Sequence, residues 1–168
     1  MAVLFISEDT IKKSTTINGN VDVELLLPYI KVAQDIHVHQ LLGTDLYNKI
    51  QNDITGGNLA GVYKTLVDTY VQPVLIHYSL FECLPFLSYK IMNKDIVRKI
   101  SETSSAASLE DIKYLRNIVK DTAEYYSERL VDYIRDNTES YPEYSSNTGS
   151  DLAPTKETYF SGIVMDRD

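Results

Sequence analysis

The sequence predicts a mainly α-helical protein: a compact helical bundle with a long C-terminal helix, a short β arm or hairpin and an extended C-terminal tail. Apolar residues recur at helical spacings of three and four through most of the chain. Helix-capping residues precede several of these stretches. After Asn137 aliphatic residues become scarce. The 168 residues, 43% of them hydrophobic, suffice for one domain with its own core, so we predict a helical domain over 1–137 and a tail over 138–168.

Two helices are predicted near the N-terminus. Ser7, followed by acidic residues and then by lysines, caps a short helix. Asp22 caps a second helix that runs to about Leu42 and stops at Gly43. Pro28 lies inside this second helix and is expected to bend it or delay its start. The apolar stripe expected to face the core contains Leu26, Tyr29, Ile30, Ala33, Ile36 and Leu41.

The middle of the chain is predicted to form the central helix of the domain. Thr44 opens a helix through about Ile54, and a flexible break follows over 55–58. From Leu59 to Met92 the chain is apolar on most faces, which is typical of a helix surrounded by others. We expect the two prolines in this stretch to divide it into kinked segments.

A short arm and a long helix follow. Asp95–Thr103 alternates weakly and carries charge, which predicts a strand or hairpin arm at about residues 93–104. Ser108 and Asp111 form a capping pattern for a helix to about Asn137, roughly 44 Å long at about 1.5 Å per residue. Its expected stripe at alternating spacings of three and four is Ile112, Leu115, Val119, Thr122, Tyr126, Arg129 and Tyr133.

The tail combines a polar spacer with an apolar tip, Tyr159–Met165. The spacer, 138–158, is rich in Ser, Asn and Thr, so we expect it to be extended and to reach up to roughly 70 Å at about 3.3 Å per residue. Such a tip is expected to add to a neighbouring chain, for instance as an edge strand, although it can also fold back onto its own domain. The residues predicted to dock on a partner are Ile96, Arg98, Ile100, Tyr141, Tyr144, Tyr159, Phe160, Ile163, Val164 and Met165.

Composition narrows the classes of partner. The chain has 13 Tyr against 4 Phe and no Trp, which suits either contact surfaces between subunits or a core with polar edges. The net charge is −8, and Lys and Arg are scattered, which disfavours a protein that grips nucleic-acid phosphates. An acidic surface is compatible with DNA that passes without adhering.

Cys83 is the one cysteine, so no intrachain disulfide can form and a reducing compartment is expected. The apolar run Met1–Ile6 has no basic leader and is too short for a membrane span. We therefore expect a protein made in the cytoplasm that does not enter a membrane.

The chemistry-bearing residues do not assemble into a predicted site. His37 and His39 are two apart on a helix, so they point about 200° from each other and are poorly placed to bind one metal ion. Cys83 is expected to be a small core residue. The carboxylates of the long helix, from Asp121 to Asp136, predict a solvated stripe, and a hydrolase built on them is the least favoured function. We predict no catalytic residues, cofactor or metal.

Several segments resemble a known group of proteins. They are Ala33-Gln34-Asp35-Ile36-His37, Leu41-Leu42-Gly43-Thr44-Asp45-Leu46-Tyr47, Asp121-Thr122-Ala123-Glu124-Tyr125-Tyr126 and Tyr141-Pro142-Glu143-Tyr144. Together they resemble small proteins from the structural gene blocks of tailed phages of Bacteroides-type hosts, including crAss-like phages. Those proteins are similar to head–tail connector, or adaptor, proteins. The resemblance covers the chain from about Leu4 to Met165.

The resemblance implies a virion structural protein without enzymatic activity. Connector proteins are helical bundles that form a ring, usually of twelve, beneath the portal, with a projecting arm and a C-terminal extension that engages neighbours. The implied partners are the portal protein, copies of the chain itself and other neck or tail proteins, around a channel through which DNA passes. The alternative is a small soluble regulatory or chaperone-like module that binds one protein transiently.

Overall fold

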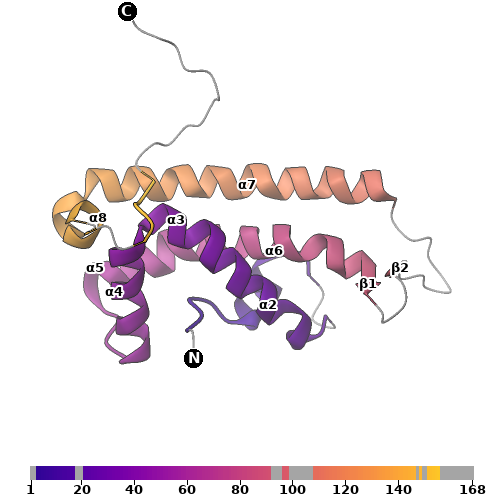
Figure 1. Ribbon diagram of the computed structural model, residues 1–168, viewed down its shortest axis with the longest axis horizontal. Helices are drawn as coiled ribbons and strands as arrows, with labels where there is room; N and C mark the ends of the chain where they lie inside the picture. The colour runs from indigo at the N-terminus through magenta and orange to yellow at the C-terminus, as the bar shows by residue number, and fades with distance from the viewer. Residues whose placement is uncertain are drawn as a thin grey trace, which may run out of the picture.

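The computed structural model describes residues 3–17, 21–91, 96–98, 108–146, 148 and 151–155, and within them the predicted mainly helical fold is confirmed. In Figure 1 the long helix α7 (Leu109–Asp136) lies along one edge of the molecule. Helix α6 (Gln72–Ser88) runs beneath α7, and α2 (Val23–Ala33) crosses α6. Because α6 contacts both of the other helices, it is the centre of the bundle.

The N-terminal helices begin where local capping predicts. α1 (Glu8–Ser14) follows Ser7, and α2 follows Asp22; each cap side chain accepts a hydrogen bond from a backbone N–H of the first turn. Pro28 lies inside α2 but does not delay its start. Capping thus determines these two boundaries locally.

A π-helical turn aligns the buried face of the second helix. α2 continues without a break into η1 (Gln34–Val38), which is π-helical, and then α3 (His39–Leu42). A π turn holds one more residue than an α turn, so side chains four apart stay on one side across it. The buried face therefore repeats every four residues, at Leu26, Ile30, Gln34, Val38 and Leu42. Ile36 faces the other way and is 53% exposed, so its predicted place in the core stripe is wrong.

The next elements turn the chain back into the core. Gly43 ends α3 with φ 74° and ψ 162°, and α4 (Thr44–Thr55) follows directly. After a short break, α5 (Gly61–Thr65) and the π-helical η2 (Leu66–Val71) lead into α6. Pro73 is the second residue of α6, whereas Pro85 lies further inside α6 and does not end it.

Helix α7 starts with a capping box. The Ser108 hydroxyl accepts from the Asp111 N–H at 3.0 Å, and the Asp111 carboxylate accepts from the Ser108 N–H at 2.8 Å. The buried residues of α7 are Ile112, Ala123, Ser127, Leu130, Val131 and Ile134. Leu115 is 49% exposed and Arg129 is exposed as well, so the predicted stripe is wrong at these two positions. A spacing of three or four is satisfied by several adjacent stripes, and contact with α6 selects one of them.

Two three-residue strands lie between α6 and α7. β1 (Tyr89–Ile91) pairs antiparallel with β2 (Ile96–Arg98), with Lys90 opposite Val97. Most of the arm predicted at about 93–104, including Ile100, lies outside the described residues. A projecting arm stays a prediction.

The first part of the predicted tail belongs to the helical body. Residues 138–146 form η3 (Thr138–Ser140) and α8 (Pro142–Ser146), and α8 packs against α4. Tyr141 and Tyr144 are 0% and 3% exposed. The prediction that this part is extended is wrong, and so is the prediction that these two tyrosines dock on a neighbour. The prediction of an extended tail followed from the many Ser and Asn residues, but the two tyrosine rings supply enough apolar area to bury the segment.

Candidate functional site

The predicted docking residues fall into three groups. Tyr159, Phe160, Ile163, Val164, Met165 and Ile100 lie outside the described residues. Ile96 and Arg98 lie on β2, where the structure describes the backbone. Tyr141 and Tyr144 are buried in their own chain. The described residues therefore do not bring the predicted docking residues together.

Tyr141 closes one end of the bundle. Its ring lies edge-on to Tyr63, with centroids 5.7 Å apart, and its hydroxyl donates to the Val62 carbonyl at 3.1 Å. A further hydrogen bond of 3.2 Å joins it to the Tyr133 hydroxyl. Burial raises the pKa of the Tyr141 phenol, and the neighbouring tyrosines raise it further. This cluster joins α5, α7 and the residues after α7.

The last described residues form a strap over the corner between α3 and α4. We call residues 151–155 the C-terminal strap. The Thr44 N–H donates to the Leu152 carbonyl at 3.0 Å, and the Leu152 N–H donates to the Thr44 hydroxyl at 2.9 Å. The Thr155 N–H donates to the Gln40 carbonyl at 3.1 Å. The strap therefore binds the last turn of α3 and the first residue of α4.

Two further contacts hold the strap. Pro154 lies over Gly43, where an added Cβ would be 2.7 Å from the proline Cδ. The Tyr144 hydroxyl donates to the Thr155 carbonyl at 2.7 Å. Tyr144 thus holds the last described residue of the strap on the helical body, which is a different role from the predicted docking.

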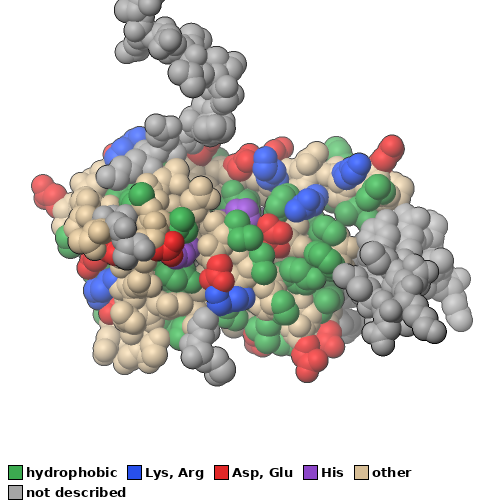
Figure 2. Space-filling view, in the orientation of Figure 1, with side chains coloured by type: hydrophobic (Ala, Val, Ile, Leu, Met, Phe, Trp, Pro, Cys, Tyr) green, Lys and Arg blue, Asp and Glu red, His purple; other side chains and the backbone are tan. Residues whose placement is uncertain are grey.

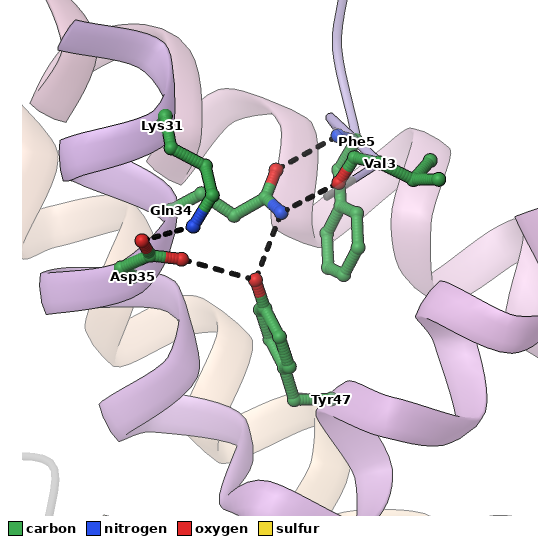
Figure 3. Close-up of polar contacts among 6 residues, drawn as sticks. All are labelled: Val3, Phe5, Lys31, Gln34, Asp35 and Tyr47. Carbon is green, nitrogen blue, oxygen red and sulfur yellow. Dashed lines mark hydrogen bonds and ion pairs between the residues drawn. The ribbon is translucent and has the colours of Figure 1, made fainter. Parts of the chain in front are cut away.

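A buried glutamine holds the N-terminal segment against η1 (Figure 3). Gln34 is fully buried; its Oε1 accepts from the Phe5 N–H at 2.8 Å, and its Nε2 donates to the Val3 carbonyl at 2.9 Å. The same Nε2 lies 2.9 Å from the Tyr47 hydroxyl, which in turn donates to Asp35 at 3.3 Å. Asp35 also pairs with Lys31. One amide side chain therefore accepts a backbone hydrogen bond from residue 5 and donates one to residue 3, as the backbone of a neighbouring β-strand would.

One exposed apolar surface lies on α2 and η1. Its members are apolar residues at least 37% exposed, and we call them the α2 ridge: Val32, Ile36 and, from α6, Phe86. Leu27 is also exposed, but it is five residues before Val32 and so lies about 140° away around α2. The Phe86 ring stacks on Tyr29 of α2, with centroids 5.0 Å apart. Figure 2 shows hydrophobic side chains gathered over α2 and α6 on the face toward the viewer. Isolated exposed apolar residues are ordinary, but a group of them marks a contact surface.

A second exposed apolar surface lies on α7. We call it the α7 stripe: Tyr114, Leu115, Ile118 and Tyr125. Tyr114 and Tyr125 are 67% and 61% exposed, on the side away from buried Ala123 and Leu130. The sequence left open whether the tyrosines belong to contact surfaces or to the core. The structure contains exposed tyrosines, such as Tyr114 and Tyr125, and buried ones, such as Tyr141 and Tyr144.

The three histidines have separate partners. His37 Nε2 lies 3.0 Å from Glu82 Oε1 and its ring stacks on Tyr78, whereas His39 Nε2 lies 3.0 Å from the Thr44 hydroxyl. His77 stacks on Tyr126, and burial lowers its pKa. Within the described part of the chain, no group of three or more His, Cys, Asp or Glu side chains is arranged to hold a metal ion.

Cys83 and the α7 carboxylates match their predicted environments. Cys83 is 1% exposed, and burial raises the pKa of its thiol to about 12, so it is the expected core residue. On α7, Glu124 pairs with Lys120 at 2.9 Å and Asp132 pairs with Arg135 at 2.7 Å, on the exposed side of the helix. None of the helices in the described ranges is both long and apolar enough to cross a bilayer.

Sequence reasoning missed Gln34 and the α2 ridge. The signal for both was the fourfold spacing: Gln34 interrupts the apolar series from Leu26 to Leu42, and Val32 and Ile36 repeat on the opposite side. A polar residue in such a series must find partners once it is buried. The π turn is what makes a spacing of four hold over this length.

A family model described as "Family of unknown function (DUF6712)" matches residues 38–153, more than half of the chain. The matched range begins in η1 and ends in the C-terminal strap. No curated protein and no solved structure matches the chain.

Proposed function

We propose that this chain, which belongs to the DUF6712 family, is a structural subunit of a phage neck: a head–tail connector that forms a ring on the portal. The family description names no function, so the proposal rests on the sequence resemblance and on the surfaces of the helical body. The partners it implies are the portal protein, neighbouring copies of the chain and other neck or tail proteins.

The observation that carries the proposal is the presence of two unlike apolar surfaces on one body. The α2 ridge and the α7 stripe belong to different helices, each packed on α6. A closed ring is built from head-to-tail contacts, in which one surface of a subunit meets a different surface of the next. Two such surfaces are what a ring subunit requires, whereas a module that binds one protein needs a single surface.

The tail contributes a second contact in this proposal. The C-terminal strap fixes the chain at Gln40, so the residues after Thr155 leave every subunit of a ring at the same place. The apolar tip Tyr159–Met165 would then engage the neighbouring subunit. The acidic charge of the chain, −8 at pH 7, would let DNA pass through the ring without adhering.

Electron microscopy of the purified protein mixed with its portal tests the proposal. We expect a closed ring of subunits on the portal. Single subunits bound to the portal without contact to one another would instead support the regulatory-module alternative. A monomer in the absence of portal decides nothing, because the portal can act as the template.

Two matched substitutions test whether the α7 stripe forms a ring contact. Ile118→Asp places a charge in the stripe, and Val62→Asp places the same charge on α5 at a residue with the same 45% exposure. We expect Ile118→Asp to abolish the ring on the portal and Val62→Asp to leave it intact. Equal ring formation by both variants would exclude the α7 stripe as a subunit contact.

Deletion of Thr158–Asp168 tests the tail. We expect the truncated chain to fold and to fail to join the particle stably, because the tip that engages the neighbour is gone. Circular dichroism checks the fold, and the protein content of purified particles checks incorporation. Normal incorporation of the truncated chain would refute the docking role of the tip.

A further inference from the structure

The outer face of α7 combines the α7 stripe with a row of exposed carboxylates. At about 100° per residue, Glu110, Asp121 and Glu128 lie about 60–80° around the helix from Ile118, all along one edge of the stripe. These three side chains are exposed and belong to no salt bridge within the described ranges. The α7 stripe is therefore an apolar surface bordered by negative charge.

The basic residues of α7 do not neutralise this edge. Arg116 and Arg129 lie over aromatic rings of α6 and η2, with their guanidinium carbons 3.9 and 4.9 Å from the ring centroids. Two others form the ion pairs within α7 described above. Lys113 lies about 140° around the helix from Ile118. A binding partner suited to this face is therefore both apolar and basic.

The strands β1 and β2, which we call the basic strands, have this composition. They carry Lys90 and Arg98, and their six residues include no acidic one. Their antiparallel pairing sets Ile91 opposite Ile96. In the sequence from 89 to 100, four of the chain's 16 Lys and Arg stand against a single acidic residue, although the whole chain has a net charge of −8. The basic strands thus belong to a locally positive part of an acidic protein.

Basic residues on the helices are largely balanced within their own elements. Lys31, Lys49 and Lys64 each pair with an aspartate four residues later. Helix α1 carries two lysines and two acidic residues. Opposite charges favour a contact and like charges disfavour one, so the basic strands are the part of another copy that suits the acidic face of α7. We infer that the α7 stripe of one copy binds the basic strands of a second copy.

The positions of the two surfaces allow a head-to-tail contact. The α7 stripe lies on the side of α7 away from its buried residues, whereas β1 follows directly on α6 and contacts it (Figure 1). Phe86 of the α2 ridge precedes β1 by three residues, so the ridge adjoins the basic strands. The inference rests on the proposed function in one respect: it names the surface that meets the α7 stripe between neighbouring subunits of the ring.

Paramagnetic relaxation between two full-length copies tests the contact without the portal. Asn93→Cys places a nitroxide between the two strands, and Cys83 does not compete for the label because it is 1% exposed. One copy carries ¹⁵N and no nitroxide, and the other carries the nitroxide and no ¹⁵N. At low salt we expect the amides of Ile118 and Tyr125 to lose more than half of their intensity, while that of Gln51 on α4 keeps its own. At about 1 M salt the Debye length falls to about 3 Å, so the loss should shrink.

Charge reversal with rescue tests the pairing. Asp121→Lys together with Glu128→Lys in the ¹⁵N chain should abolish the loss, because both sides of the contact are then positive. Lys90→Glu together with Arg98→Glu in the spin-labelled chain should restore it. Glu139→Lys, which reverses an exposed carboxylate on η3, should leave the loss unchanged. Rescue by the second pair of substitutions excludes misfolding as the cause of the first effect.

The inference is overturned if Ile118 and Tyr125 keep full intensity in the mixture, if the reversed chain loses as much intensity as the original, or if the second reversal does not restore the loss. A loss seen only when one dilute chain carries both labels would also overturn it, because the chain's own strands would then reach the stripe. A ring on the portal without loss in the mixture would refute this contact alone. Loss in the mixture without a ring on the portal would refute the proposed function alone.

Discussion

Replacement of Gln34 by leucine tests whether the N-terminal segment is held by one amide side chain. The substitution removes the acceptor for the Phe5 N–H and the donor to the Val3 carbonyl, while Tyr47 keeps Asp35 as a partner. A buried donor left without a partner costs about 1–3 kcal/mol. The Val3 carbonyl is only partly buried and can turn to water, which adds less. We therefore expect Gln34→Leu to lower the free energy of unfolding by about 2–4 kcal/mol.

Urea unfolding followed by circular dichroism measures this loss, and Gln72→Leu is the matched control. Gln72 donates one exposed hydrogen bond to Asp68 at 3.3 Å, so its replacement is expected to change stability by no more than about 0.5 kcal/mol. Hydrogen exchange at the Phe5 amide should accelerate in Gln34→Leu and not in Gln72→Leu. If the two variants are equally stable, or if the Phe5 amide stays protected, the glutamine does not hold the segment.

Three further predictions follow from buried groups. Tyr141→Ala should lower stability by about 3–5 kcal/mol and Tyr141→Phe by about 1 kcal/mol in urea unfolding, whereas an exposed docking residue would leave it unchanged. Cys83 should resist alkylation at pH 8 until urea unfolds the chain. Burial raises the pKa of its thiol from 9.0 to about 12, so the free energy of unfolding should also fall as the pH rises above about 9. Rapid labelling of the folded protein would contradict both expectations. Gly43→Ala should cost about 1–3 kcal/mol in backbone strain and expose the Thr155 amide to exchange, because its φ of 74° with ψ 162° favours glycine and Pro154 fills the space of a Cβ. Gly57→Ala, at φ 67° with no atom within 4 Å, should leave the Thr155 amide protected.

The boundaries of the helices could be read from the sequence because their causes are local. Ser7, Asp22 and Ser108 cap the helices that follow them, and Gly43 supplies the positive φ that ends α3. A cap is a hydrogen bond between residues two or three apart, so it does not depend on distant contacts. The burial of Cys83 was predictable for a similar reason, since its whole neighbourhood is apolar.

The surfaces were not predictable in the same way. The sequence placed Ile36 and Leu115 in the core and Tyr141 and Tyr144 on a partner, and all four are reversed in the structure. Helical spacing states that residues share a face but not which face meets the core. That choice is made by the elements packed against it, which come from distant parts of the chain.

Sequence alone thus determined the helical class, the main helix boundaries and the central place of α6, because capping, glycine geometry and apolar density act over a few residues. Tertiary structure alone decided the π turn that buries Gln34, the folding of residues 138–146 and 151–155 onto the helical body and the two apolar surfaces left exposed. Those outcomes depend on contacts between positions such as 5 and 34 or 40 and 155. Their free energy is gained only when the packed elements meet, so a local pattern such as the spacing of four residues can indicate them but cannot decide them.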